Sequence, residues 1–166
     1  MKFEKDIKII LSSEIINLME NCVEAARPNE ACGIIYGEIK QVEKNSNSNN
    51  FEVQYISKDF NCVSSNRKSP VAFLVDDTET LNQYHEKAHQ LNLRFLSIFH
   101  SHPAGAHPSG VDLNNMKFLD EFNPYGNFKP YKNLIWIIID AQNKELNGFI
   151  YFKNELMKID VQIDKK

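Results

Sequence analysis

Residues 95 to 112 read Phe-Leu-Ser-Ile-Phe-His-Ser-His-Pro-Ala-Gly-Ala-His-Pro-Ser-Gly-Val-Asp, and this stretch decides which fold and which chemistry the chain can support. Its first five residues form a largely apolar run of strand length that leads directly into His100. Because successive side chains of a strand point to opposite faces, His100 and His102 project to the same side, where two imidazoles can share one metal ion. The stretch therefore predicts a buried strand that ends in a pair of candidate ligands.

The residues after the two histidines supply a third candidate ligand. Two prolines and Gly105 mark a loop from Ser101 to Pro108, and the apolar residues beyond it recur at helical spacing. Asp112 falls in the first turn of that helix, close enough in sequence for its carboxylate to reach back toward the histidines. Two imidazole nitrogens and one carboxylate oxygen leave the fourth tetrahedral position of a zinc ion open for water, as a catalytic zinc site requires. The hydroxyl of Ser109 would then lie where it can hydrogen-bond an oxyanion beside the metal.

Each of these features also has a purely structural interpretation. A His-x-His pair at a strand end is often just two rim histidines. Ser109 and Asp112 also suit the start of a helix, where the serine caps free amides and the aspartate faces the helix dipole. Taken one at a time, the structural interpretations are the better ones. Together, the histidine pair, the serine and the carboxylate lie within 13 residues, and that combination favours a metal site.

A second histidine pattern competes for the metal. Residues 85 to 89 read His-Glu-Lys-Ala-His, which is the His-Glu-x-x-His pattern that many zinc proteases carry on a helix. In the predicted helix from Thr78 to Leu93 the apolar stripe lies elsewhere, so that both histidines should face water or the rim of the protein. The third ligand of such proteases is also missing, because no histidine follows at the required distance and no glutamate occurs between Glu86 and Glu121. We interpret this pattern as a solvated helix face.

Helix-like and strand-like periodicities alternate along the rest of the chain without an internal repeat. An α/β fold, in which helices cover a sheet, is the simplest architecture for that order. The predicted helices are 12–26, 78–93 and the segment after Pro108; the predicted strands are 30–38, 51–56, 71–75, 95–99, 134–140, 148–153 and 156–163; 43–50, 57–70 and 123–132 are predicted to be irregular.

Composition excludes several classes of function. The chain has 166 residues and a formal net charge of −3 with scattered lysines, so we expect one domain and no nucleic-acid partner. No apolar run approaches the length of a membrane span, which predicts a cytoplasmic protein without a membrane partner. Cys22, Cys32 and Cys62 are an odd number of cysteines without C-x-x-C spacing, which argues against a disulfide framework and against cysteine-bound zinc. Any metal must then be held mainly by His, Asp or Glu.

Two motifs together resemble a known family. The pattern His100-Ser-His-Pro, followed by Pro108-Ser-x-x-Asp112, is similar to the signature of the JAMM, or MPN-plus, zinc metalloproteases. Residues 28 to 37 read Pro-Asn-Glu-Ala-Cys-Gly-Ile-Ile-Tyr-Gly and resemble the Pro-x-Glu-x-Cys-Gly stretch of the prokaryotic members. The order of elements, including Ser69-Pro-x-x-Phe73, is similar as well, so the resemblance covers nearly the whole chain. It implies a single MPN-like domain over residues 1–166, with a mixed sheet flanked by helices.

The resemblance also implies a function and a site. His100, His102 and Asp112 would bind Zn²⁺, Glu30 would act as general base, and Ser109 would stabilise the oxyanion. Such enzymes cleave the bond after the C-terminal glycine tail of ubiquitin or of a ubiquitin-like or sulfur-carrier protein, and this chain resembles the stand-alone prokaryotic type. Two alternatives stay open, namely an MPN-type interaction scaffold with an impaired metal site and a zinc amidase that acts on a small molecule.

The sequence departs from the family pattern at one point. Between His102 and Ser109 the chain has six residues, whereas the family usually has seven. A shorter loop would shift Ser109 or Asp112 relative to the histidines, and His107 would then be the alternative ligand. We also expect the segments 57–70 and 123–132 to form walls of the substrate site.

Overall fold

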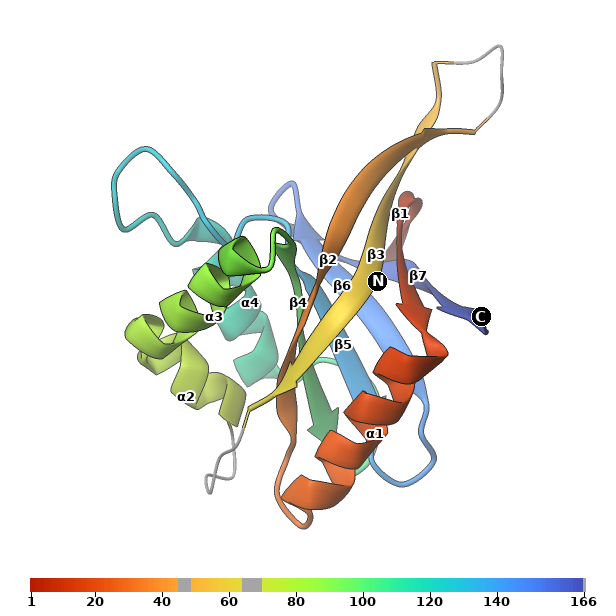
Figure 1. Cartoon of the computed structure of the whole chain (residues 1–166), viewed down its shortest axis with the longest axis vertical. Coiled ribbons are helices and arrows are strands. Elements are labelled where there is room, and N and C mark those ends of the chain that lie inside the picture. The colour runs from red at the N-terminus through yellow and green to blue at the C-terminus, as the bar shows by residue number, and fades with distance from the viewer. Residues whose placement is uncertain (45–48, 64–69, 166) are drawn as a thin grey trace.

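The apolar runs of the chain form the strands of one curved sheet in the computed structural model, and the amphipathic segments form the helices around it (Figure 1). The structure describes residues 1–44, 49–63 and 70–165. Part of the loop expected at 43–50, part of the irregular segment 57–70 and Ser69 lie outside these ranges. The elements are β1 (Lys2–Ser12), α1 (Ser13–Ala26), β2 (Cys32–Glu43), β3 (Phe51–Cys62), α2 (Pro70–Asp76), α3 (Thr78–Gln90), β4 (Arg94–His102), α4 (Gly110–Glu121), β5 (Ile135–Asp140), β6 (Leu146–Phe152) and β7 (Glu155–Asp164).

The strand that carries the two histidines lies inside the sheet. The strand order is β1-β3-β2-β4-β5-β6-β7, and a parallel pairing of β1 with β7 closes the sheet. β4 pairs antiparallel with β2 and parallel with β5, so that Ile98 lies between Ile34 and Trp136. Every residue of β4 from Phe95 to Ser101 is consequently buried, which fixes the end of the strand from which His102 projects.

Helices cover both faces of the sheet. Figure 1 shows α1 on one side of the strands and α2, α3 and α4 on the other. The sheet has a hydrophobic core on each face, and successive side chains of β5 point into one core and then the other. Ile137 packs in the core that contains Met19 of α1, whereas Trp136 packs in the core that contains Leu81 of α3 and Met116 of α4. This is the predicted α/β architecture with a mixed sheet between helices. Over the described part of the chain, no helix combines the length and the apolarity needed to cross a bilayer.

Three element predictions were wrong or incomplete. Residues 71–75, predicted as a strand, belong to helix α2; Val71, Leu74 and Val75 are buried because they share one helical face at spacings of three and four residues. The segment after Ser57 was predicted to be irregular, but β3 continues along β2 as far as Cys62. Strand β1 had not been predicted, although its buried residues Ile7, Ile9 and Leu11 alternate with the period of a strand.

The expectation that the cysteines form no disulfide was also wrong. Cys22 of α1 and Cys62 at the end of β3 form a disulfide with a Cα–Cα distance of 5.7 Å, and Cys32 is the free, buried thiol. The odd count remains compatible with one bridge because one cysteine is left over. The pairing depends on α1 packing beside β3, which the spacing of the cysteines in the sequence does not reveal.

Loss of this disulfide is expected to lower the free energy of unfolding by about 3–4 kcal/mol, because the bridge closes a loop of sequence separation 40 in the unfolded chain. Urea unfolding of the oxidised protein with and without reductant measures the effect. The variant Cys62→Ser should unfold at the same urea concentration under both conditions. A wild-type protein whose unfolding is insensitive to reductant would contradict the prediction.

Candidate metal centre

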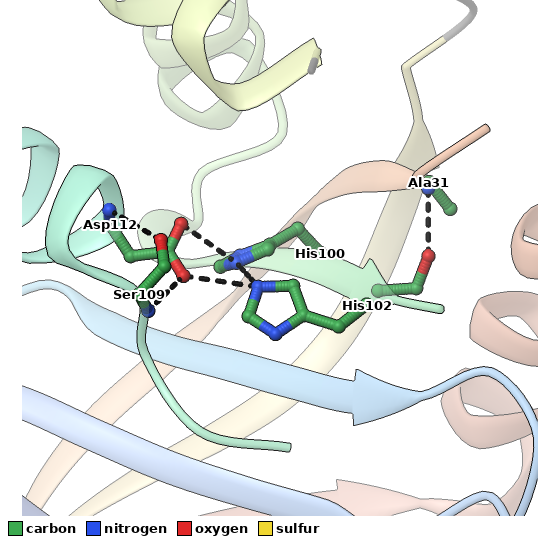
Figure 2. Close-up of polar contacts among 6 residues, drawn as sticks. Ala31, His100, His102, Ser109 and Asp112 are labelled. Carbon is green, nitrogen blue, oxygen red and sulfur yellow. Dashed lines mark hydrogen bonds and ion pairs between the residues drawn. The ribbon is translucent and has the colours of Figure 1, made fainter. Parts of the chain in front are cut away.

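The end of β4 and the first turn of α4 bring three candidate ligands together. The Nε2 atoms of His100 and His102 lie 3.1 Å apart. Asp112 faces both, with Oδ1 at 3.3 Å from Nε2 of His100 and Oδ2 at 3.0 Å from Nε2 of His102 (Figure 2). These residues form a group whose ligand atoms all lie within 4.8 Å of one another and that could hold a metal ion.

The geometry of this group fits a small tetrahedral ion. Nitrogen and oxygen ligands at about 2.0–2.1 Å from a tetrahedral zinc ion are separated from each other by about 3.3–3.4 Å. The Nε2 atoms of the two histidines are 3.1 Å apart, close to that edge length, and each lies 3.0 or 3.3 Å from one of the two oxygens of Asp112. The donor set of two imidazoles and one carboxylate is also typical of zinc sites that keep one position open. The residues therefore fit a metal with an exchangeable fourth ligand.

Burial and the hydrogen bonds among the three candidate ligands determine their protonation states. His100 is 1 % exposed and Asp112 is 8 % exposed. Burial acts to raise the pKa of Asp112, but hydrogen bonds to His100 and His102 outweigh it and hold that pKa well below its ordinary value. The hydrogen bond to Asp112 in turn raises the pKa of His102. Asp112 is thus an ionised carboxylate at neutral pH, which is the form that ligates metals.

Glu30 lies just before β2, and the strand pairing brings it to the same end of the sheet. Cys32 pairs with His100 across β2 and β4. Burial raises the pKa of Glu30, whereas the charges of His100 and His102 act to lower it. Glu30 is therefore a half-buried carboxylate whose pKa is affected by both histidines, and it can accept or release a proton beside the candidate ligands.

Ser101 fixes this arrangement, a role that sequence reasoning missed. Strand alternation turns its side chain away from the two histidines, and its hydroxyl accepts a hydrogen bond from the backbone amide of Ala31 at 2.8 Å. The amide of Ser101 donates to the carbonyl of Ala31 at 3.1 Å. The residue between the two histidines therefore holds the backbone next to Glu30. In the sequence, the serine itself is the only indication of this role.

Ser109 is the N-cap of α4. Its hydroxyl accepts a hydrogen bond from the amide of Asp112 at 3.0 Å, and Oδ2 of Asp112 accepts one from the amide of Ser109 at 2.8 Å. This reciprocal capping box orients the carboxylate toward the histidines. The structural and chemical interpretations of Ser109 are compatible, because a hydroxyl that accepts one hydrogen bond still has its own proton to donate.

Removal of the cap is expected to cost about 1 kcal/mol of folding free energy in Ser109→Ala. Ser109→Asp is the matched control, because an aspartate side chain can accept the same hydrogen bond from the amide of Asp112 and should keep most of that stability. Urea unfolding of the three metal-free proteins measures the difference. Equal stability of Ser109→Ala and the wild type would show that the capping bond does not stabilise the helix.

The short loop between His102 and Ser109 does not separate the ligands. Asp140, at the end of β5, accepts a hydrogen bond from the amide of Gly105 at 2.7 Å, and the amide nitrogen of the Asn147 side chain donates to the carbonyl of Ala106 at 3.0 Å. Both anchoring side chains are buried. They hold the loop in a path that returns Asp112 to the histidines, and exposed His107 is not part of the ligand group.

The His-Glu-x-x-His pattern lies elsewhere. His89 is exposed on α3, and His85 is half-buried at the rim, where its ring stacks on Phe95 with a centroid distance of 6.3 Å. Across the described ranges, the only group of three or more His, Cys, Asp or Glu residues that could hold a metal ion is the one at the end of β4. The segment 123–132 also lies away from that group, because Phe128, Lys129 and Lys132 line a cavity at the start of β4.

The protein thus has a mixed sheet between helices, with a His-x-His pair at the end of β4 and a third candidate ligand from α4. This arrangement is that of an MPN-type α/β domain with a candidate metal centre. Residues 13–149 match the family described as prokaryotic homologs of the JAB domain, and the chain belongs to this family. The resemblance drawn from the two motifs is thereby confirmed.

Individual relatives agree with this assignment. A desampylase from Pyrococcus furiosus is 29% identical over 136 residues, which cover 81% of this chain and 76% of the relative. The solution structure of protein DSY2949 from Desulfitobacterium hafniense superposes with a TM-score of 0.65 at 22% identity, over 95% of this chain and 94% of that one. The crystal structure of AF2198, a JAB1/MPN domain protein from Archaeoglobus fulgidus, gives a TM-score of 0.52 at 10% identity, over 95% and 99%. The two solved structures support the fold.

Proposed function

We propose that this protein is a zinc-dependent metalloprotease that cleaves the bond after the C-terminal glycine tail of a ubiquitin-like or sulfur-carrier protein. The convergence of His100, His102 and Asp112 beside Glu30 is the observation that carries the proposal. The relative from Pyrococcus furiosus supports the substrate class, because a desampylase acts on a ubiquitin-like modifier.

The proposed roles follow from the position of each side chain. Zinc held by His100, His102 and Asp112 would polarise the scissile carbonyl and lower the pKa of a bound water toward neutrality. Glu30 would accept the proton of the attacking water and return it to the leaving amine. The hydroxyl of Ser109 would donate a hydrogen bond to the oxyanion that develops on the substrate. Cys32 takes no part, since it is fully buried and burial raises the pKa of its thiol far above neutrality.

A cleavage assay tests this function directly. The substrates are fusions in which a ubiquitin-like or sulfur-carrier protein ending in Gly-Gly precedes a reporter, either in linear linkage or through a lysine side chain. Mass spectrometry should find cleavage directly after Gly-Gly by the zinc-loaded protein, and none when Gly-Gly is replaced by Ala-Ala. A zinc-loaded protein that cleaves no such fusion would contradict the proposal. Cleavage only of small amides would support the amidase, and a protein that binds no zinc would support the scaffold.

A further inference from the structure

A cavity of about 500 Å³ lies at the opposite end of β4 from the metal centre. It is formed where the C-terminal part of α3, the first residues of β4 and the segment 128–134 before β5 meet, with Tyr55 of β3 among them. In Figure 1, β4 begins next to the end of α3 and runs away from it toward its arrowhead, where the histidines lie. Arg94 and His102 are the two ends of β4, and a strand of that length spans about 26 Å.

The walls of this cavity are rich in positive charge. The lining includes the cations Arg94, Lys129 and Lys132, two histidines and no acidic residue, although the whole chain has a formal net charge of −3. Clustered cations repel one another unless an anion lies between them, so such a lining is suited to a negatively charged ligand.

Nearby carboxylates neutralise little of this charge. Within the described residues, Arg94 and Lys129 have no ion pair, and the ammonium of Lys132 lies 4.0 Å from Asp120. That carboxylate also accepts a hydrogen bond from the amide of Asn133 at 2.9 Å. Burial lowers the pKa of His85 although the charge of Glu86, on the solvent side of α3, acts to raise it, so His85 adds no positive charge at neutral pH. Arg94 and Lys129 are therefore the cations with the least internal compensation.

Aromatic side chains form the other part of the lining. Phe95 packs edge-on against Tyr131, with a ring-centroid distance of 5.6 Å, and stacks on His85. Tyr55 is held by a hydrogen bond from its hydroxyl to the carbonyl of Asn133 at 2.8 Å. Phe128 leaves 55 % of its surface exposed at the mouth. Phe95 and Tyr55 are buried and form the floor, so Phe128 is the phenyl ring that a ligand can reach. An exposed ring beside unpaired cations offers both a stacking surface and charge-assisted hydrogen bonds.

We propose that this cavity binds a phosphorylated aromatic small molecule of about mononucleotide size, in a site separate from the metal centre. The phosphates would contact Arg94 and Lys129, and the aromatic ring would lie against Phe128, the exposed phenyl ring of the lining. The volume is within the range of about 300–1,000 Å³ that is usual for small-molecule sites. Because no residue is shared with the candidate ligands, the proposal holds independently of the proposed protease activity.

Calorimetric titration with magnesium-free ADP at low ionic strength tests the proposal. The wild type should bind one ADP per chain, and the double variant Arg94→Gln with Lys129→Gln should bind at least about 100-fold more weakly, since it loses two charge-assisted contacts to the phosphates. Lys117→Gln, which removes an exposed lysine of α4 outside the cavity, should bind as the wild type does. His102→Ala should also bind normally, which separates this site from ADP held by zinc. Thermal unfolding confirms that each variant is folded.

Several results would overturn the proposal. These are the absence of ADP binding by the wild type at millimolar concentration, equal affinity in the double variant, and loss of binding in His102→Ala. Titration with inorganic phosphate and with adenosine tests the two halves of the ligand, since each should bind at least about tenfold more weakly than ADP if charge and stacking both contribute. Phosphate that binds as tightly as ADP would refute the aromatic part.

Discussion

His102→Ala is expected to lose its zinc, from about one ion per chain in the wild type to below about 0.1. The substitution removes one of three ligand atoms and leaves only His100 and Asp112, whose positions would no longer close around an ion. Elemental analysis of protein purified without chelator measures the content. A companion variant, Asp112→Asn, removes the charge of the third ligand with little change in shape and should lose zinc as well.

His89→Ala provides the matched control for this experiment. It removes an exposed histidine from the His-Glu-x-x-His pattern on α3 and should retain about one zinc ion per chain. Zinc that disappears with His89 and persists without His102 would place the metal on α3 and refute the site at the end of β4. A wild-type protein without zinc would favour the scaffold over the protease.

Glu30→Gln should keep its zinc and lose most of its activity, with kcat reduced by about 10²–10⁴. Glutamine has nearly the shape of glutamate but cannot accept a proton, and Glu30 is not a member of the ligand group. Cleavage of a Gly-Gly fusion and zinc content are therefore measured on the same preparation. The combination of full zinc content with lost activity distinguishes a general base from a ligand or a structural residue.

Glu121→Gln is the comparison for Glu30→Gln, because it neutralises an exposed carboxylate at the far end of α4. This variant should cleave at the wild-type rate. If Glu30→Gln with a full complement of zinc also cleaves at that rate, another group must accept the proton, and the role proposed for Glu30 is wrong.

The candidate ligands could be predicted from sequence because local rules determine their geometry. Strand alternation places His100 and His102 on one face, and the turn of a helix returns Asp112 toward them. The same local rules failed at residues 71–75, where a five-residue apolar run fits a strand as well as it fits one buried helical face. Short apolar runs do not contain enough residues to separate the two periods.

The remaining features depend on contacts between distant parts of the chain. The bond between Cys22 and Cys62 requires α1 to pack beside β3. The support that Asp140 gives to Gly105, 35 residues earlier, requires β5 to pair with β4. Neither pairing leaves a pattern in a single sequence, so the ligands were predictable and the residues that hold them in place were not.

The anchoring of the loop by Asp140 and Asn147 has a consequence for how the protein is made. All the candidate ligands and the proposed base precede residue 113, so they are synthesised before β5 and β6. At that stage the strand with the histidines lacks its parallel neighbour, and the loop lacks both of its anchors. A nascent chain that ends after α4 contains every ligand but has no preformed site, and competence for metal is acquired only when the last third of the chain has folded.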